Sequence, residues 1–232
     1  MNLGFNTRVG LEDIREGLRL YKEHNFDMVE ADADIKAYYL FKFQKNKNKT
    51  LALMRIIRQV VEANKKFIKK LADGGVTETD FIICCYLIRT FPFLKTVLEE
   101  MNFSEDDGEI RARVVRERIN LDVTKLSLAN AVSNAMHIFT EAGILKRVGK
   151  GIYKYSDETK IDDWERKAVI FTFMGDGNLT NITEIVKGRY FGHIDIILKG
   201  EFMRENKEYQ SILSGGDFVV FSRGYATVKS NL

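Results

Sequence analysis

The sequence predicts a mainly helical α+β protein with small β-hairpins, and three observations support this class. Apolar residues recur at intervals of three and four along most of the chain, which is the spacing of one buried helix face. The 232 residues contain a single proline, Pro92, so little interrupts the helices. Two pairs of short segments meet at glycine, within 146–155 and within 217–229, as hairpins do.

The composition is that of a globular protein. Hydrophobic residues make up 45% and charged residues 30%, which excludes a disordered chain. The net charge of +3 permits a nucleic-acid partner without requiring one. Cys84 and Cys85 are adjacent in an apolar run, which indicates reduced, buried thiols and a cytoplasmic protein.

Membrane association and cofactor binding are not expected. No apolar run approaches the ~20 residues that cross a bilayer, and the N-terminus lacks the apolar stretch of a signal peptide. The three histidines are scattered and no CxxC pair is present, so we expect no zinc site.

Residues 1–74 are expected to form a helical N-terminal segment. Helices are predicted at 11–24 and 50–72, with a polar loop at 44–49; 26–43 reads as mostly helical, with a strand near 38–43 as the alternative. Ten basic residues between 42 and 70 face one acid, Glu62, and such a surface gains from phosphate contact through counterion release. The alternative is a solvated lysine-rich face. The proposed contacts here are Lys45, Lys47 and Lys49.

Residues 75–158 are expected to form a second unit around one amphipathic helix. Thr77 is the predicted cap of a helix at 80–90, and a further helix is predicted at 93–102. A capped start at 104–107 then precedes a helix at 109–121, whose inward residues are Ile110, Val114 and Ile119. The amphipathic helix is predicted to begin at the N-cap Ser127 and to end at Gly143. Its buried stripe comprises Leu128, Val132, Ala135, Met136, Phe139 and Ala142.

A helix that ends in AGIL (142–145) and leads into a basic hairpin with an aromatic strand resembles the recognition helix and wing of winged-helix DNA-binding domains. The resemblance implies that this helix enters the major groove of double-stranded DNA. Its outward face carries Asn130, Ser133, Asn134, His137 and Glu141, and asparagine pairs bidentately with adenine. A solvated face, or a protein-interaction surface, is the alternative.

Basic side chains around this helix are the predicted phosphate contacts. The hairpin supplies Lys146, Arg147 and Lys150. In winged helices the preceding helix crosses the DNA backbone, which here would place Arg111, Arg113, Arg116 and Arg118 against phosphates. The alternative is that these arginines pair with Glu109 and Glu117.

Residues 159–232 repeat the same order and are interpreted as a second winged-helix-like unit. Helices are predicted at 161–174, 180–186 (capped by Thr180) and 194–213, with a hairpin formed by 217–222 and 225–229. The expected architecture is therefore a helical N-terminal segment followed by tandem winged helix-turn-helix domains. The second unit is less basic, so we expect it to stabilise the fold or to bind a partner rather than to read bases.

Residues 76–169 also resemble the recognition region of AlwI-type restriction and nicking endonucleases, through TETD (77–80), AGIL (142–145) and ETKI (158–161). The resemblance implies DNA recognition within a restriction or defence system. Such enzymes carry a separate nuclease domain, for which we expect no room in this chain.

The leading hypothesis is a non-enzymatic double-stranded DNA-binding protein, acting as a transcription regulator or as the recognition component of a restriction system. One alternative is an adaptor that docks a larger DNA-processing or chromosome-organising complex. The other is a small metal-dependent nuclease that uses Asp34 and Lys36, beside Glu30 and Asp32. The sequence leaves open the target site, the oligomeric state and a separate catalytic subunit.

Overall fold

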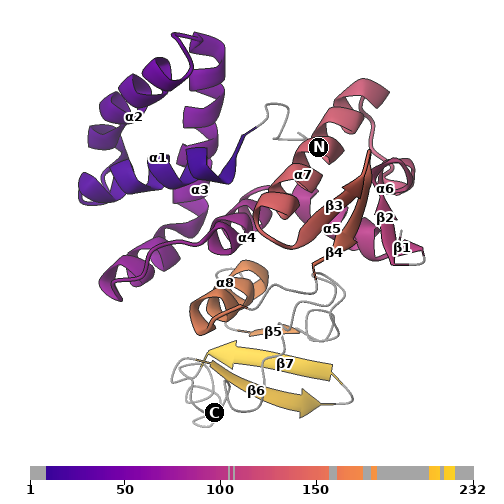
Figure 1. Cartoon of the computed structure of the whole chain (residues 1–232). Helices are drawn as coiled ribbons and strands as arrows, with labels where there is room; N and C mark the ends of the chain where they lie inside the picture. Colours follow the sequence, from indigo (N-terminus) through magenta and orange to yellow (C-terminus); the bar gives the residue numbers. More distant parts are fainter. Residues whose placement is uncertain are drawn as a thin grey trace.

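The computed structural model describes residues 9–103, 105–106, 108–156, 161–174, 179–181, 209–214 and 217–222. Within these residues the chain is mostly helical with two small antiparallel sheets, so the α+β class is confirmed (Figure 1). Helices α1 (Leu11–Glu23), α2 (Met28–Lys42) and α3 (Lys47–Asp73) form the N-terminal part.

The N-terminal helices follow the predicted periodicity. The inward residues of α1, among them Ile14 and Leu18, are buried. The helix α2 continues to Lys42, so the strand near 38–43 is not formed. The helix α3 begins at Lys47 rather than at residue 50, because the Asn46 side chain accepts a hydrogen bond from the Lys49 amide and so caps the helix. The predicted 44–49 loop is correspondingly short.

Helix α4 (Asp80–Thr90) lies at the centre of the fold. Its residues 81–88 are all buried, and α1, α3, α5 (Pro92–Phe103) and α7 (Lys125–Glu141) pack around it together with α8 (Asp163–Met174). The N-cap is Thr79 and not the predicted Thr77, since the Thr79 hydroxyl accepts a hydrogen bond from the Ile82 amide. An all-apolar helix surface requires neighbours on every side, and α4 has them.

The segment predicted as one helix at 109–121 is divided between a strand and a helix. Strand β2 (Glu109–Arg111) places Ile110 opposite Tyr153, and only α6 (Ala112–Arg118) is helical. Ile110 is therefore buried by strand pairing, and Val115, rather than the predicted Val114, is the buried residue of α6. Strand β1 (Glu105–Asp106), paired with β2, stands where a helix start was predicted.

The amphipathic helix and its hairpin form as predicted, with one difference at the cap. Helix α7 begins at Lys125 because the Thr124 hydroxyl, not Ser127, is the N-cap. All six residues of the predicted stripe are buried. Gly143 ends the helix with a φ of +74°, which suits glycine. Strands β3 (Leu145–Gly149) and β4 (Ile152–Tyr155) then pair antiparallel, and the sheet order is β1-β2-β4-β3.

Helix α8 joins the same core as the preceding helices. It packs on α4, where the Thr172 hydroxyl donates to the backbone carbonyl of Cys85 and the Arg89 guanidinium lies 4.3 Å from the ring centroid of Phe171. The contiguous core cluster includes residues from Val9 to Ile170 and thus members of all three predicted segments. Among the described helices, none is by itself long and apolar enough to cross a membrane; only α4 and α5 taken together, bent by 108°, reach that length.

The C-terminal part differs from the predicted second winged helix. Strand β5 (Leu179–Asn181) stands where a helix capped by Thr180 was predicted, and β6 (Tyr209–Ser214) occupies the end of the predicted 194–213 helix. Strand β7 (Asp217–Ser222) pairs with both β6 and β5. Two glycines separate β6 from β7 in the sequence, as short hairpin connections require.

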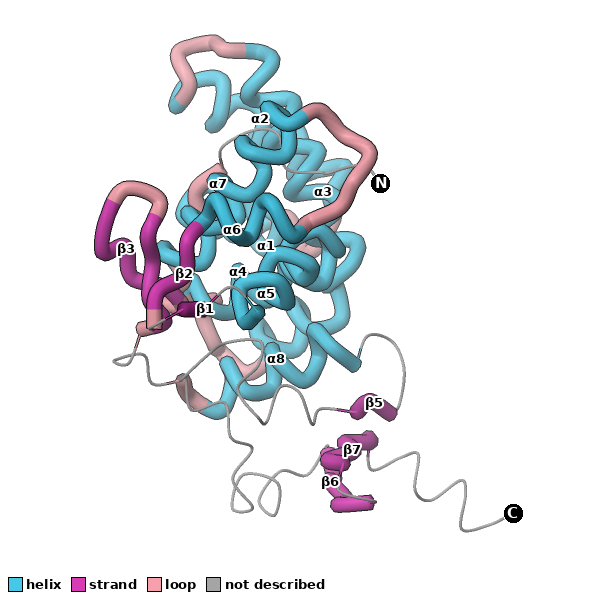
Figure 2. The backbone as a smooth tube through the Cα atoms, turned by 90° about the vertical axis from the view of Figure 1, so that its right-hand side faces the viewer, coloured by secondary structure: helices cyan, strands magenta, loops and turns pink. Residues whose placement is uncertain are grey.

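This sheet lies beyond α8 at one end of the molecule (Figure 2). The remainder of the predicted 180–186 and 194–213 helices, and the predicted 225–229 strand, lie outside the described residues.

Candidate nucleic-acid interface

A pocket of about 190 Å³ lies between the outward face of α7 and the β3–β4 hairpin. Four of its lining residues come from one face of α7 and two come from the hairpin: Ser133, Asn134, His137, Thr140, Arg147 and Tyr153. Arg147 and Tyr153 are cross-strand partners in β3 and β4, so their side chains share one face of the hairpin. We refer to this feature as the α7–hairpin pocket. It brings three predicted base-reading residues together with one predicted phosphate contact.

Helical spacing explains how α7 supplies its side of the pocket. Residues 130, 133, 134 and 137 share the face opposite the buried stripe. Asn130 and Ser133 are exposed, whereas Asn134 and His137 are half-buried, and Asn130 does not line the pocket. The Thr140 hydroxyl donates to the Met136 carbonyl at 2.7 Å, so its oxygen remains available only as an acceptor.

The carboxylate of Glu141 ties α7 to the N-terminal helices. One oxygen accepts a hydrogen bond from the Leu11 amide at 2.9 Å, at the first residue of α1. The other oxygen lies 3.3 Å from Nε2 of His137, one turn back along α7. Glu141 thereby orients the His137 ring and satisfies an otherwise unpaired amide at a helix N-terminus.

The hairpin concentrates positive charge. Lys146, Arg147 and Lys150 are exposed, and Lys146 stands directly opposite Lys154 across the strands. Like charges at opposed positions destabilise a strand pair. Nε of Arg147 donates to the Gly149 carbonyl at 3.1 Å, which uses one of the five guanidinium donors and fixes the side chain along the strand.

The four arginines predicted to lie before the recognition helix are on two elements, and three of them form ion pairs with glutamates. Arg111 belongs to strand β2 and lies 3.7 Å from Glu109. Arg113 and Arg118 of α6 form ion pairs with Glu117 at 2.7 Å and with Glu100 at 2.8 Å. Arg116, also on α6, is half-buried.

These ion pairs are accessible to solvent. The hydrogen bond from Arg113 lowers the pKa of the Glu117 carboxyl. Exposed pairs of this kind contribute little stability.

The lysines of the α2–α3 connection are remote from the α7–hairpin pocket. Lys45 and Lys47 are exposed, and Lys49 Nζ lies 3.9 Å above the Phe43 ring. In Figure 1 this connection and the β3–β4 hairpin lie in separate parts of the molecule. A single short DNA contact cannot centre on both.

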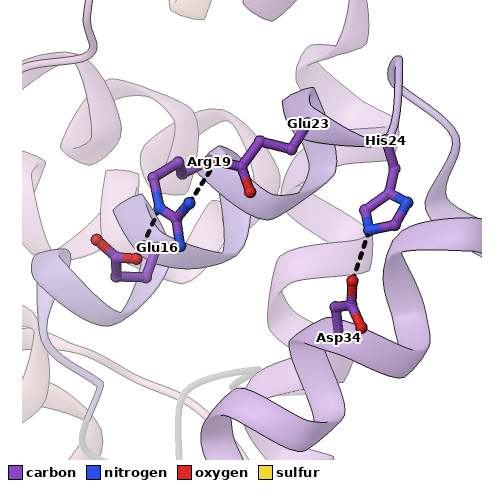
Figure 3. Close-up of polar contacts among 5 residues, drawn as sticks. All are labelled: Glu16, Arg19, Glu23, His24 and Asp34. Atoms are coloured by element: carbon purple, nitrogen blue, oxygen red, sulfur yellow. Dashed lines mark hydrogen bonds and ion pairs between the residues drawn. The ribbon is translucent and has the colours of Figure 1, made fainter.

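The acidic residues considered for a nuclease centre all lie on α2, and two of them, Asp32 and Asp34, have separate partners. Asp34 is 2.9 Å from Nε2 of His24, as Figure 3 shows beside the Arg19 pairs with Glu16 and Glu23. Asp32 accepts both hydrogen bonds of a fork-like contact with Arg58. Among the described residues, no group of three or more His, Cys, Asp or Glu side chains lies close enough to hold a metal ion.

Two residues of the pocket, Thr140 and Tyr153, were not predicted. Thr140 follows Ser133 by seven positions and so shares its helix face, which is a signal present in the sequence. Tyr153 reaches the pocket only because its strand partner is Arg147. No protein-family model matches the chain, and neither a curated protein nor a solved structure matches it. Function is therefore inferred from the geometry and chemistry of this interface.

Proposed function

We propose that the chain is a double-stranded DNA-binding protein in which residues 80–155 form a winged-helix unit. The observation that carries the proposal is the convergence of the outward face of α7 and the basic hairpin on one pocket. The chain order supports it: α4, α5, β2, α6, α7 and then the β3–β4 hairpin follow the winged-helix sequence of elements, with β2 closing the small sheet.

Charge along this surface favours a polyanion. No acidic residue occurs on α7 from 125 to 140, and none occurs from 144 to 156. The only carboxylate between these segments, Glu141, is engaged by the Leu11 amide and His137. A surface that presents many cations and amides and a single carboxylate is typical of nucleic-acid binding.

In this proposal α7 lies in the major groove, which is wide enough for one helix. Asn130 and Asn134, one turn apart on the outward face, read adenines, and Lys146, Arg147 and Lys150 hold the flanking phosphates. Lys45, Lys47 and Lys49 make additional contacts with backbone phosphates when the DNA is long. Recognition within a regulatory or restriction system is the expected setting.

The proposal is tested by fluorescence anisotropy of a labelled random 30-base-pair duplex, titrated with the full chain across a salt series. We expect a micromolar Kd at low salt, which is the range of non-specific complexes, and a steep loss of affinity with salt. Arg147→Ala and Lys146→Ala should each weaken binding and reduce the salt slope by about one.

The matched control is Lys36→Ala, which removes one exposed charge from α2, away from the hairpin. It should leave the Kd and the salt slope near those of the wild type. Absence of binding at low salt would refute the proposal.

A second candidate function, protein docking, is favoured by apolar side chains exposed on the N-terminal helices. Phe41 is 88% exposed and Leu51 is 58% exposed, at the adjoining ends of α2 and α3. Large exposed apolar side chains that gather in a patch mark interaction surfaces. An adaptor would bind its partner in high salt and lose it on Phe41→Ser, whereas DNA binding would fail in high salt and tolerate that change.

A further inference from the structure

The chemistry of the α7–hairpin pocket is that of a small anion site. Its lining includes one permanently charged group, the guanidinium of Arg147, and no carboxylate. Hydroxyls of Ser133 and Tyr153, the amide of Asn134 and the imidazole of His137 surround the same space. Guanidinium and hydroxyl donors converging on a concave surface bind tetrahedral oxyanions through charge-assisted hydrogen bonds.

The carboxylate of Glu141 is outside the pocket lining. One of its oxygens accepts a hydrogen bond from the Leu11 amide at 2.9 Å, and the other lies 3.3 Å from His137 Nε2. Lys146 and Lys154, opposed in the same hairpin, add positive charge on its other face. The cations of the hairpin thus outnumber this one carboxylate, which favours an anion in the pocket.

The size of the pocket limits its occupant. A volume of about 190 Å³ equals roughly six water molecules at their share of liquid volume. It is below the ~300 Å³ at which pockets for larger organic ligands begin. One phosphate group with a few waters fits these dimensions.

We propose that the α7–hairpin pocket binds a single phosphate group. Arg147 supplies the charge, Ser133 and Tyr153 donate hydrogen bonds, and His137, whose Nε2 faces Glu141, forms part of the wall together with Thr140, whose proton is used by Met136. This places His137 in the wall of a phosphate site rather than at a base edge and leaves Asn130 as the principal reader on α7. The inference rests on the proposed DNA function only for the source of the phosphate, which is either the DNA backbone or a free nucleotide.

The test is a ¹H–¹⁵N NMR titration of the full chain with sodium phosphate, at fixed pH and at ionic strength held constant with sodium chloride. We expect saturable shifts confined to the amides of residues 133–140 and 147–153. Arg147→Gln should raise the phosphate Kd by about tenfold or more, because it removes hydrogen bonds to a charged group. Ser133→Ala should raise it less.

Lys125→Gln is the matched control, since it removes one exposed positive charge from the start of α7 but does not line the pocket. It should change the phosphate Kd by no more than about twofold, because salt screens charges that do not contact the anion. Shifts that never saturate, or an equal loss in Lys125→Gln and Arg147→Gln, would overturn the assignment.

Adding AMP or a duplex then distinguishes the two sources of the phosphate. A duplex that displaces phosphate from these amides identifies a backbone phosphate as the occupant. AMP that displaces it while the duplex does not bind identifies a free nucleotide; the pocket assignment then stands and the DNA function fails. Duplex binding that persists without any phosphate site refutes the pocket assignment alone.

Discussion

Two asparagines on α7 have unequal positions relative to the hairpin. Asn130 is exposed and does not line the pocket, whereas Asn134 is half-buried and lines it. An amide that pairs with adenine must reach the base edge in the groove, which the outward position of Asn130 allows. In the proposed complex, base reading and phosphate holding would therefore be distributed over adjacent turns of one helix.

The double variant Asn130→Ala, Asn134→Ala is expected to relax sequence preference by ~1–3 kcal/mol for each good base contact, with a smaller loss of non-specific affinity. Selection of preferred sites from a random duplex library, followed by competition binding, measures both quantities. Asn48→Ala, an exposed asparagine on α3, is the control. Unchanged preference in the double variant would mean that α7 does not read bases.

Two buried tyrosines provide a matched pair for stability. The Tyr39 hydroxyl donates to the Asp13 carbonyl, whereas the buried Tyr86 hydroxyl has no hydrogen-bond partner among the described residues. Burial raises the pKa of both phenols, so both are neutral at pH 7.

Tyr39→Phe should therefore lower the free energy of unfolding by about 1 kcal/mol, and Tyr86→Phe should leave it unchanged or raise it slightly. Urea denaturation of the two variants gives the comparison. An equal loss in both would show that the Tyr86 hydroxyl is satisfied in solution.

The sequence predicted the α7 half of the pocket better than the hairpin half. Spacing alone placed Ser133, Asn134 and His137 on one face, because helical period is a local property. The contribution of Tyr153 depends on the strand register, which shifts between Arg147 and Gly149. A register is set by packing and by irregularities of the hairpin, and neither is visible in residue types alone.

At the scale of elements, competition between local and tertiary preference decides several segments. Residues 109–111 continue a helical pattern, yet they pair with β4, because the hairpin has an open edge that β2 covers. The same competition explains why residues 209–213 form a strand within a pattern that predicted a helix. Long amphipathic stretches such as α3 and α7 were predicted correctly because their burial agrees with their period.

Gly17 of α1 packs against Ile57 of α3. A Cβ there would collide with Cδ1 of Ile57 and lie 3.0 Å from the Tyr39 hydroxyl. Gly17→Ala should thus destabilise the fold by ~1–3 kcal/mol, despite the better helix propensity of alanine. Equilibrium urea unfolding measures the change.

The control for this prediction is the pair Gly17→Ala, Ile57→Val, in which the colliding methyl is removed. Ile57→Val alone should cost about 0.5–1.5 kcal/mol, and the pair should cost less than the sum of the two single changes. A stabilised Gly17→Ala variant would show that α1 and α3 separate readily.

At the scale of the whole molecule, the core does not follow the predicted segments. Helix α8 was assigned with residues 159–232, but Ala168, Val169 and Ile170 are members of the core that surrounds α4. Glu165 accepts a hydrogen bond from the Thr79 hydroxyl at 2.6 Å, beside the α4 cap. The helix therefore completes the body that carries the α7–hairpin pocket.

A chain ended after Ser156 should lose cooperative unfolding or aggregate, because it exposes the face of α4 that α8 covers. A chain ended after Met174 keeps every described member of the core cluster and should retain a sharp thermal transition. Circular dichroism melts with size-exclusion chromatography compare the two. Identical transitions would show that α8 contributes nothing to the stability of the core.

Glu141 links the first described helix, α1, to α7, the helix proposed to bind DNA. The carboxylate holds the Leu11 amide and His137 together, although Leu11 and Glu141 are 130 residues apart in the chain. Thermodynamic coupling through this contact is reciprocal. If binding at α7 changes the free energy of displacing the start of α1, displacing α1 changes the free energy of binding at α7 by the same amount.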